Sequence, residues 1–253
     1  LKWHLCRCTG YKKIEKAIEY SAELIAENKC CDNNSHNKGV GDFMPKYEAF
    51  ETAIGQRKFV NDMSFPGMLH GALRFSDHPR ARVLKIDTTE ALKCEGVEQI
   101  FTAADIPGNR IVGLIFKDWP MMIAVGETTK YIGDVLAGVV ADTADNARKA
   151  AKKIVIEYEV LTPVTDPHKA LKESSPQVQE NHVNLLENCV LKQGNAAEVI
   201  AKSKFSYHNI FQTQRIEHAF IETESALAMP DGDGVLLYSA GQGIYEDRSQ
   251  VAS

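Results

Sequence analysis

Between residues 50 and about 165, short β-rich runs alternate with helical stretches, and this alternation constrains the fold more than any other feature of the chain. Such a mixture is typical of domains in which helices pack on a sheet. The clearest helix follows Asp142 or Thr143 as its N-cap, and small residues on one stripe would let it pack closely on a sheet. The stripe consists of Ala144, Ala147, Ala151 and Ile154, and strands are expected near residues 68–75, 82–86, 97–101, 135–141 and 154–158. The segment therefore predicts an α+β or α/β domain.

A second group of strand signals begins after a proline-containing crossing segment at residues 162–185. Strands are expected at residues 203–212, 225–229 and 235–238. The turn sequence PDGDG at residues 230–234 separates the last two strands, so these should form a β-hairpin. The final residues, 250–253, are typical of the start of a helix.

The first 49 residues differ in pattern from the rest of the chain. Apolar residues recur at spacings of three and four over residues 11–27, which predicts an amphipathic helix with one buried face near Cys6 and Cys8. Residues 28–49 are polar and predict a linker at a domain boundary. The adjacent Cys30 and Cys31 have no partner at metal-ligand spacing, and we expect them to be exposed thiols.

Charge and composition exclude several classes of partner. A formal net charge of -5 provides no basic field for nucleic acid or for an anionic membrane. No apolar run approaches the roughly 20 residues that cross a bilayer, and the N-terminus lacks a signal-peptide pattern. Two pairs of the six cysteines are too close in sequence to bridge without strain. These features favour a reduced, cytoplasmic location, and the absence of an initial Met favours an internal piece of a longer chain.

The tripeptide Cys6-Arg7-Cys8 is the strongest metal-ligand signal in the sequence. Two thiolates separated by one residue on a tight loop can converge on one ion, and soft thiolates select zinc or iron-sulfur iron. Two ligands complete neither type of site, so the others would come from residues before Leu1. The alternative is a buried pair of cysteines without metal.

The context of this tripeptide resembles a known family. The stretch LCRCTGYKKI at residues 5–14 resembles the segment that supplies two cluster ligands in the helical 2Fe-2S domain of molybdenum hydroxylases, the xanthine dehydrogenase and aldehyde oxidoreductase family. The resemblance implies that Cys6 and Cys8 ligate a 2Fe-2S cluster together with an upstream C-x-x-C pair. It also implies that Cys8 lies beside the pterin of the molybdenum cofactor, on the electron path.

Most of the remaining chain resembles the same family. Matches to its a/b hammerhead domain are TAIGQRKFVND (52–62), GMLHGA (67–72), HPRAR (78–82), IDTTEA (86–91), GV (96–97), FTAADIPG (101–108) and GDVLAGVVA (133–141), and EHAFIE (217–222) is similar to the opening of the molybdenum domain. The resemblance implies an α+β protein with four parts. These are the end of a 2Fe-2S domain (1–27), a linker (28–49), an a/b hammerhead domain (50–165), and a linker with the start of a molybdopterin-binding domain (166–253).

Gly241-Gln242-Gly243 matches the position where this family places a glutamine beside the molybdenum. The resemblance implies that Gln242 acts in catalysis and that Gly241 and Gly243 help to bind the cofactor. A side-chain amide there can donate a hydrogen bond to a ligand of the metal and tune it. The spacing alone favours a solvent-facing turn glutamine between two flexible glycines, and only the resemblance favours the site beside the molybdenum.

Other candidate residues point to structure rather than chemistry. Glu217 and His218 are adjacent, and neighbours on a strand face opposite sides, so an acid/base pair is disfavoured. The glycines at residues 39–41 and 232–234 do not form a G-x-G-x-x-G pattern after a strand, so no dinucleotide site is expected.

The resemblance implies hydroxylation of a heteroaromatic carbon or an aldehyde, with water as oxygen source and electrons leaving through 2Fe-2S clusters. KDWP (117–120), IAVGE (123–127) and GQGIY (241–245) look most like selenium-dependent xanthine dehydrogenases, which favours a purine, xanthine or hypoxanthine, over an aldehyde. The short linker leaves no space for a flavin domain, so any FAD would be carried by a separate subunit. In the family the general base is a glutamate near the C-terminus, which this sequence does not contain, so the piece alone should be inactive. A homo-oligomer is expected, and the rival hypothesis is a non-catalytic metal-binding scaffold.

Overall fold

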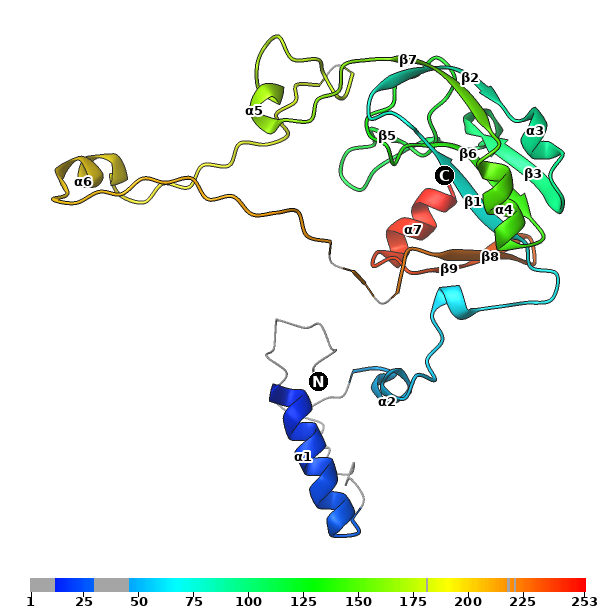
Figure 1. Ribbon diagram of the computed structural model, residues 1–253, viewed down its shortest axis with the longest axis horizontal. Helices are drawn as coiled ribbons and strands as arrows, with labels where there is room; N and C mark the ends of the chain where they lie inside the picture. Colours follow the sequence, from blue (N-terminus) through cyan, green and yellow to red (C-terminus); the bar gives the residue numbers. More distant parts are fainter. Residues whose placement is uncertain (1–11, 30–45, 181, 218, 221) are drawn as a thin grey trace. The chain divides into compact units, whose positions relative to one another are not determined.

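The computed structural model describes residues 12–29, 46–180, 182–217, 219–220 and 222–253 (Figure 1). The chain divides into two compact units, Leu1–Lys58 and Phe59–Ser253. Helices and strands are mixed along the second unit, as expected for an α+β protein.

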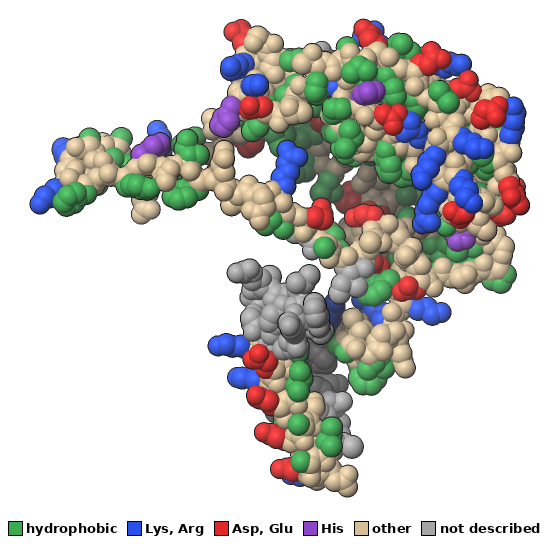
Figure 2. Space-filling model, viewed as in Figure 1, with side chains coloured by type: hydrophobic (Ala, Val, Ile, Leu, Met, Phe, Trp, Pro, Cys, Tyr) green, Lys and Arg blue, Asp and Glu red, His purple; other side chains and the backbone are tan. Residues whose placement is uncertain are grey.

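The first unit contains helices α1 (Lys12–Ala26) and α2 (Ala49–Ala53). Helix α1 confirms the helix expected at residues 11–27, and hydrophobic side chains line one of its sides (Figure 2). The expected burial of that face is not observed, because no residue of α1 is buried and Ile25 is 80% exposed. Cys6 and Cys8, near which the face was expected to pack, lie outside the described residues, as do Cys30 and Cys31, which were expected to be exposed thiols.

The second unit is built on an antiparallel sheet in the order β1 (His70–Phe75), β6 (Val135–Ala141), β3 (Val97–Thr102). Helix α4 (Ala144–Ala151) packs against β1 and β6 (Figure 1). Thr143 is its N-cap, since the side-chain oxygen accepts a hydrogen bond from the Asn146 N–H at 3.2 Å. The core under the helix contains Ala91, Ala137, Val139, Ala150, Ala151 and Ile154. Small side chains on the helix thus allow the close approach that the sequence predicted.

A two-stranded ladder completes the expected set of strands, pairing β2 (Ala81–Asp87) with β7 (Val155–Val160). All five strands predicted between residues 50 and 165 are therefore confirmed. A second core cluster of Val83, Ile123 and Leu136 joins this ladder to β6. The shorter elements are η1 (Val60–Asp62), α3 (Thr89–Leu92), η2 (Ala103–Asp105), β4 (Ile111–Val112) and β5 (Trp119–Pro120).

Strands β8 (Ala226–Asp231) and β9 (Gly234–Ser239) form the expected β-hairpin. Its two-residue loop places Gly232 at φ 61°, a conformation that glycine adopts without steric cost. Three helices complete the second unit: α5 (Pro167–Ala170), α6 (Ala196–Lys202) and α7 (Ile244–Val251). In the described part of the chain, no helix is long and apolar enough to cross a membrane.

Two expectations for the C-terminal region are wrong. Residues 203–212 form no strand, and they stay exposed because no described segment pairs with their backbone. Residues 250–253 do not begin a helix, because α7 already starts at Ile244 and ends at Val251. Gly243 precedes α7 without a side-chain cap, so the start signal at the true position is limited to the acidic residues Glu246 and Asp247 in the first turn.

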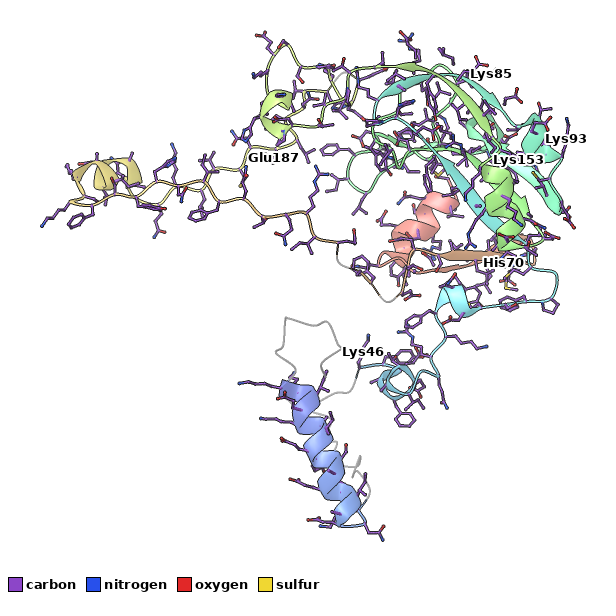
Figure 3. All side chains as sticks on the ribbon, viewed as in Figure 1. Lys46, His70, Lys85, Lys93, Lys153 and Glu187 are labelled. Carbon is purple, nitrogen blue, oxygen red and sulfur yellow. The ribbon has the colours of Figure 1, made fainter. Side chains whose placement is uncertain are left out.

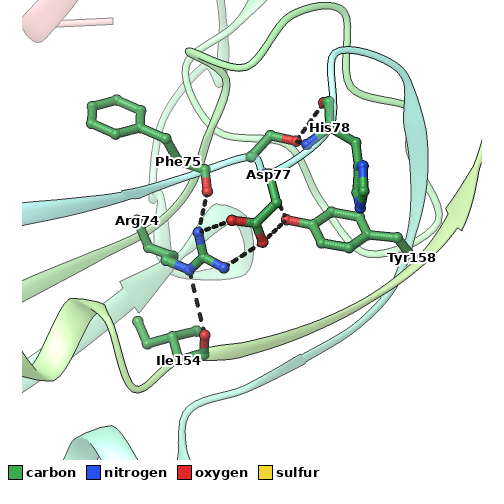
Figure 4. Close-up of polar contacts among 7 residues, drawn as sticks. Arg74, Phe75, Asp77, His78, Ile154 and Tyr158 are labelled. Atoms are coloured by element: carbon green, nitrogen blue, oxygen red, sulfur yellow. Dashed lines mark hydrogen bonds and ion pairs between the residues drawn. The ribbon is translucent and has the colours of Figure 1, made fainter. Parts of the chain in front are cut away.

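A polar network on the second unit joins β1, the loop after it and β7 (Figure 4). Arg74 donates to both carboxylate oxygens of Asp77, at 2.9 and 2.5 Å, and to the carbonyls of Phe75 and Ile154. The Tyr158 hydroxyl donates to Asp77 Oδ2 at 3.2 Å. The hydrogen bonds from Arg74 lower the pKa of Asp77, and the same contact raises the pKa of Arg74.

This network makes the stability of the second unit depend on pH. Because the pKa of Asp77 is lower in the folded than in the unfolded state, its contribution is complete above the ordinary value of 3.8. The contribution is lost as the pH falls through the lowered folded-state pKa. We expect Asp77→Asn to reduce the thermal midpoint at neutral pH, and the difference from wild type to shrink below about pH 4.

Thermal unfolding of wild type and Asp77→Asn between pH 7 and pH 2 measures this dependence. Asp233→Asn, in the exposed loop of the β8–β9 hairpin, is the matched control and should track wild type. If the thermal midpoint of Asp77→Asn stays below that of wild type by the same amount down to pH 2, the expectation is contradicted.

Candidate functional site

The glutamine turn, defined as Gly241-Gln242-Gly243, connects the end of β9 to the start of α7 (Figure 1). Before it, the Ala240 N–H donates to the Ser225 carbonyl at 3.2 Å and extends the hairpin by one residue. After it, the Asp247 N–H donates to the Gly243 carbonyl at 2.9 Å in the first turn of α7. The turn is therefore anchored by backbone hydrogen bonds on both sides.

The Gln242 side chain is exposed, and no described residue makes a hydrogen bond to it. A primary amide carries two N–H donors and one carbonyl acceptor. Within the described residues, these groups are not used to hold the fold. They remain available for a partner that the protein binds.

Close neighbours leave no room for a side chain at position 241 of the glutamine turn. A Cβ atom added to Gly241 would lie 2.6 Å from Asp247 Oδ2 and 3.1 Å from Ser239 Oγ. At Gly243 the nearest atom would be 3.7 Å away, an ordinary contact distance. Neither glycine has a positive φ, so close approach rather than backbone conformation explains Gly241.

A hollow of about 470 Å³ lies beside α7, and Asp247 is part of its wall. Its lining is mostly apolar and comes from the loop around residues 106–112, from Met121, from β9 and from α7. Residues 106–121 and the β9–α7 region therefore line the same hollow, and Asp247 belongs to its wall.

A partly buried ion pair between Arg110 and Glu127 holds the loop that carries Met121. Arg110 binds both carboxylate oxygens of Glu127, at 2.9 and 2.6 Å, and donates to the Met122 carbonyl at 2.8 Å. Burial opposes ionisation of Glu127, but the hydrogen bonds from Arg110 and from the Ala124 N–H outweigh it, and the pKa of Glu127 is lowered. This wall of the hollow is thus held by charge-assisted hydrogen bonds.

Three lysines of the second unit, Lys85, Lys93 and Lys153, lie away from the glutamine turn and the hollow, with their side chains exposed (Figure 3). Lys85 pairs with Asp87 at 3.0 Å and Lys93 with Glu90 at 2.7 Å, while Lys153 is exposed after α4. Neighbouring carboxylates therefore form ion pairs with Lys85 and Lys93.

The structure places only some of the residues expected from the sequence. Gly241, Gln242 and Gly243 form one exposed turn, whereas Cys6, Cys8 and His218 lie outside the described residues. The described part of the chain contains no group of three or more metal-ligating side chains. Sequence reasoning missed Ser239 and Asp247, because their contact depends on how the chain reverses direction at the turn.

Two family models match the chain. "Aldehyde oxidase and xanthine dehydrogenase, a/b hammerhead domain" matches residues 54–162, and "Molybdopterin cofactor-binding domain" matches residues 175–253. The glutamine turn and Asp247 lie inside the second match. The resemblance to a molybdenum hydroxylase is confirmed by these matches.

Comparison of the chain with individual proteins points to the same family. The chain is 33% identical to a probable xanthine dehydrogenase subunit of Bacillus subtilis over 78% of this chain and 26% of that protein. It is 31% identical to the nicotinate dehydrogenase large molybdopterin subunit of Eubacterium barkeri over 84% of this chain and 50% of that protein. The solved aldehyde oxidoreductase from Desulfovibrio gigas matches with a TM-score of 0.77 at 27% identity, covering 93% of this chain and 28% of that one. The chain thus spans a quarter to a half of the length of these relatives.

Proposed function

Because the chain belongs to the aldehyde oxidase and xanthine dehydrogenase family of molybdenum oxidoreductases, we propose that the full-length protein hydroxylates a purine, xanthine or hypoxanthine, with water as the oxygen source. The observation that carries the proposal is the exposed Gln242 amide, which no described residue engages and which lies within the segment matched by the molybdopterin-binding domain. The proposal concerns the full-length protein, because the chain spans only a quarter to a half of the length of its relatives.

The residues of the glutamine turn fit the molybdenum cofactor by their chemistry. Gln242 would hold the cofactor through a side-chain amide, and Gly241 and Gly243 would let the backbone come close to a bulky group. When bound, the cofactor supplies the two-electron oxidation of the substrate. The contribution of Gln242 is to orient and polarise the group that it contacts, since a primary amide does not ionise near neutral pH and so does not act as a general acid or base.

For electron transfer, we propose that Cys6 and Cys8 ligate a 2Fe-2S cluster and that Cys8 lies on the path between cofactor and cluster. Thiolates on alternate residues of a tight loop suit iron-sulfur iron. The other ligands would be supplied from outside this sequence.

A purine is favoured over an aldehyde on two grounds. The stretches KDWP (117–120) and IAVGE (123–127) resemble xanthine dehydrogenases of the selenium-dependent type, and Glu127 of the second stretch holds the wall of the hollow. Two relatives are named for heteroaromatic compounds, xanthine and nicotinate. Aldehyde oxidation is the second candidate, because the aldehyde oxidoreductase matches this fold with a TM-score of 0.77.

We also propose that FAD is bound by a separate subunit rather than by this chain. The linker expected at residues 28–49 is too short to contain a flavin domain. Two relatives are themselves named as subunits.

Purified full-length protein tests these proposals in one set of measurements. We expect molybdenum and pterin at about one per chain, no stoichiometric flavin on this chain, and faster turnover of xanthine or hypoxanthine than of benzaldehyde. Faster turnover of benzaldehyde would favour the aldehyde alternative. Protein without molybdenum and without turnover of either substrate would refute the enzymatic function, and stoichiometric FAD would refute the separate flavin subunit.

A further inference from the structure

A side-chain link crosses the base of the glutamine turn. The Gly241 N–H donates to Ser239 Oγ at 3.0 Å, and the Ser239 hydroxyl donates to Asp247 Oδ2 at 3.1 Å. Ser239 is the last residue of β9, and Asp247 lies in the first turn of α7. The link therefore ties together the element before the turn, the turn itself and the element after it.

The link and the absence of a side chain at residue 241 depend on each other. A Cβ atom on Gly241 would lie 2.6 Å from Asp247 Oδ2, and the carboxylate is the flexible end of its side chain. Alanine at position 241 would therefore push the carboxylate away from Ser239. The absence of a Cβ atom at Gly241 thus leaves room for the Asp247 carboxylate to accept the hydrogen bond from Ser239.

The surroundings of Asp247 distinguish it from the neighbouring acid. Asp247 and Ser239 are both partly buried, so water competes less for their hydrogen bond, and a bond to a carboxylate is stronger than one between neutral groups. Glu246 shares the favourable position at the start of α7, but it is exposed and no described residue bonds to its carboxylate. A role limited to stabilising the helix start would apply to both acids, whereas the contact with the turn belongs to Asp247.

We propose that Asp247 is a positioning residue, which acts through Ser239 to fix the glutamine turn and so to present the Gln242 amide to the molybdenum cofactor. The proposal rests on the proposed function of Gln242. Its physical basis is preorganisation, because an exposed turn flanked by two glycines has many accessible conformations unless a contact selects one. The Ser239–Asp247 link provides that contact.

Amide hydrogen exchange of the full-length protein tests whether the link holds the turn, without reference to activity. Peptides covering residues 239–245 should exchange about 3- to 10-fold faster in Ser239→Ala, Asp247→Ala and Gly241→Ala than in wild type, because each variant breaks the link. Asp247→Asn keeps an acceptor oxygen and should restore most of the protection. Glu246→Gln should match wild type. The Ser239→Ala, Asp247→Ala double variant should exchange no faster than the faster single variant, because both remove one interaction.

Steady-state kinetics on xanthine then test whether the fixed turn serves the cofactor. Asp247→Ala should lower kcat about 10-fold at unchanged molybdenum content and with KM within about twofold, as is usual for residues that orient a contact to a metal centre. Asp247→Asn should recover part of this loss, and Glu246→Gln should keep full activity. A merely structural residue would instead lower molybdenum content or thermal stability without a selective loss of kcat.

Three results would overturn the proposal in different ways. If Gln242→Ala lowers turnover but Ser239→Ala and Asp247→Ala change neither exchange nor kcat, then Gln242 functions without the link and the role of Asp247 is wrong. If exchange accelerates as expected but Gln242→Ala keeps full activity, then the link holds the turn and the proposed function of Gln242 is wrong. Equal losses of kcat in Glu246→Gln and Asp247→Ala would assign the effect to charge at the helix start.

Discussion

Replacing Gln242 by alanine is expected to lower turnover about 10- to 100-fold while molybdenum stays bound, which is the usual effect of losing a contact around a metal centre. The fold should be nearly unaffected, because the Gln242 side chain is exposed and no described residue depends on it for a hydrogen bond. The loss should therefore reside in the chemistry and not in the amount of folded enzyme.

Steady-state turnover of xanthine and hypoxanthine, measured with molybdenum content and thermal stability, decides this prediction. Gln99→Ala is the matched control, since Gln99 is an exposed glutamine on strand β3 and should retain wild-type turnover. Full activity of Gln242→Ala at equal molybdenum loading would show that Gln242 is only a turn residue.

Replacing Cys8 by serine is expected to abolish one 2Fe-2S signal in the electron paramagnetic resonance spectrum of the reduced full-length protein. A serine hydroxyl is a harder and far less acidic ligand than a thiolate, so it is a poor substitute on iron-sulfur iron. Turnover should also be lost, because electrons would no longer leave by the proposed path. Cys8 lies outside the described residues, so this prediction rests on the sequence alone.

The control for this experiment is Cys189→Ser, because Cys189 is an exposed free thiol in the second unit. That variant should keep every cluster signal and normal turnover. An unchanged cluster spectrum in Cys8→Ser, at wild-type iron content, would refute the assignment of Cys8 as a ligand.

The strands and helix α4 between residues 70 and 160 were predictable because their signals are local and agree with the packing. In β6 the residues VLAGVVA are suited to a strand covered on both faces, and the alanines of α4 are spaced to lie against it. The β8–β9 hairpin followed from its turn sequence in the same way. In each case the pattern along the chain matches the period of the element.

The errors have two causes: a strand needs a partner that is distant in the sequence, and a helix can begin without a capping side chain. Residues 203–212 have β-forming side chains, but a strand also needs a second strand, and none of the described segments supplies one. Helix α7 was placed too late because a glycine precedes it instead of a capping side chain. The glutamine turn was located by resemblance, but the Ser239–Asp247 link could not be predicted, since the two residues meet only after the chain reverses.

The packing of helix α4 also has a consequence for how this protein can evolve. Ala147 and Ala150 are completely inaccessible to solvent and Ala151 nearly so, which leaves no volume for larger side chains without moving the helix off the sheet. Arg148, Lys149 and Lys152 on the other side are exposed and free of such limits. Mutations should therefore accumulate on one side of α4 and be eliminated by selection on the other.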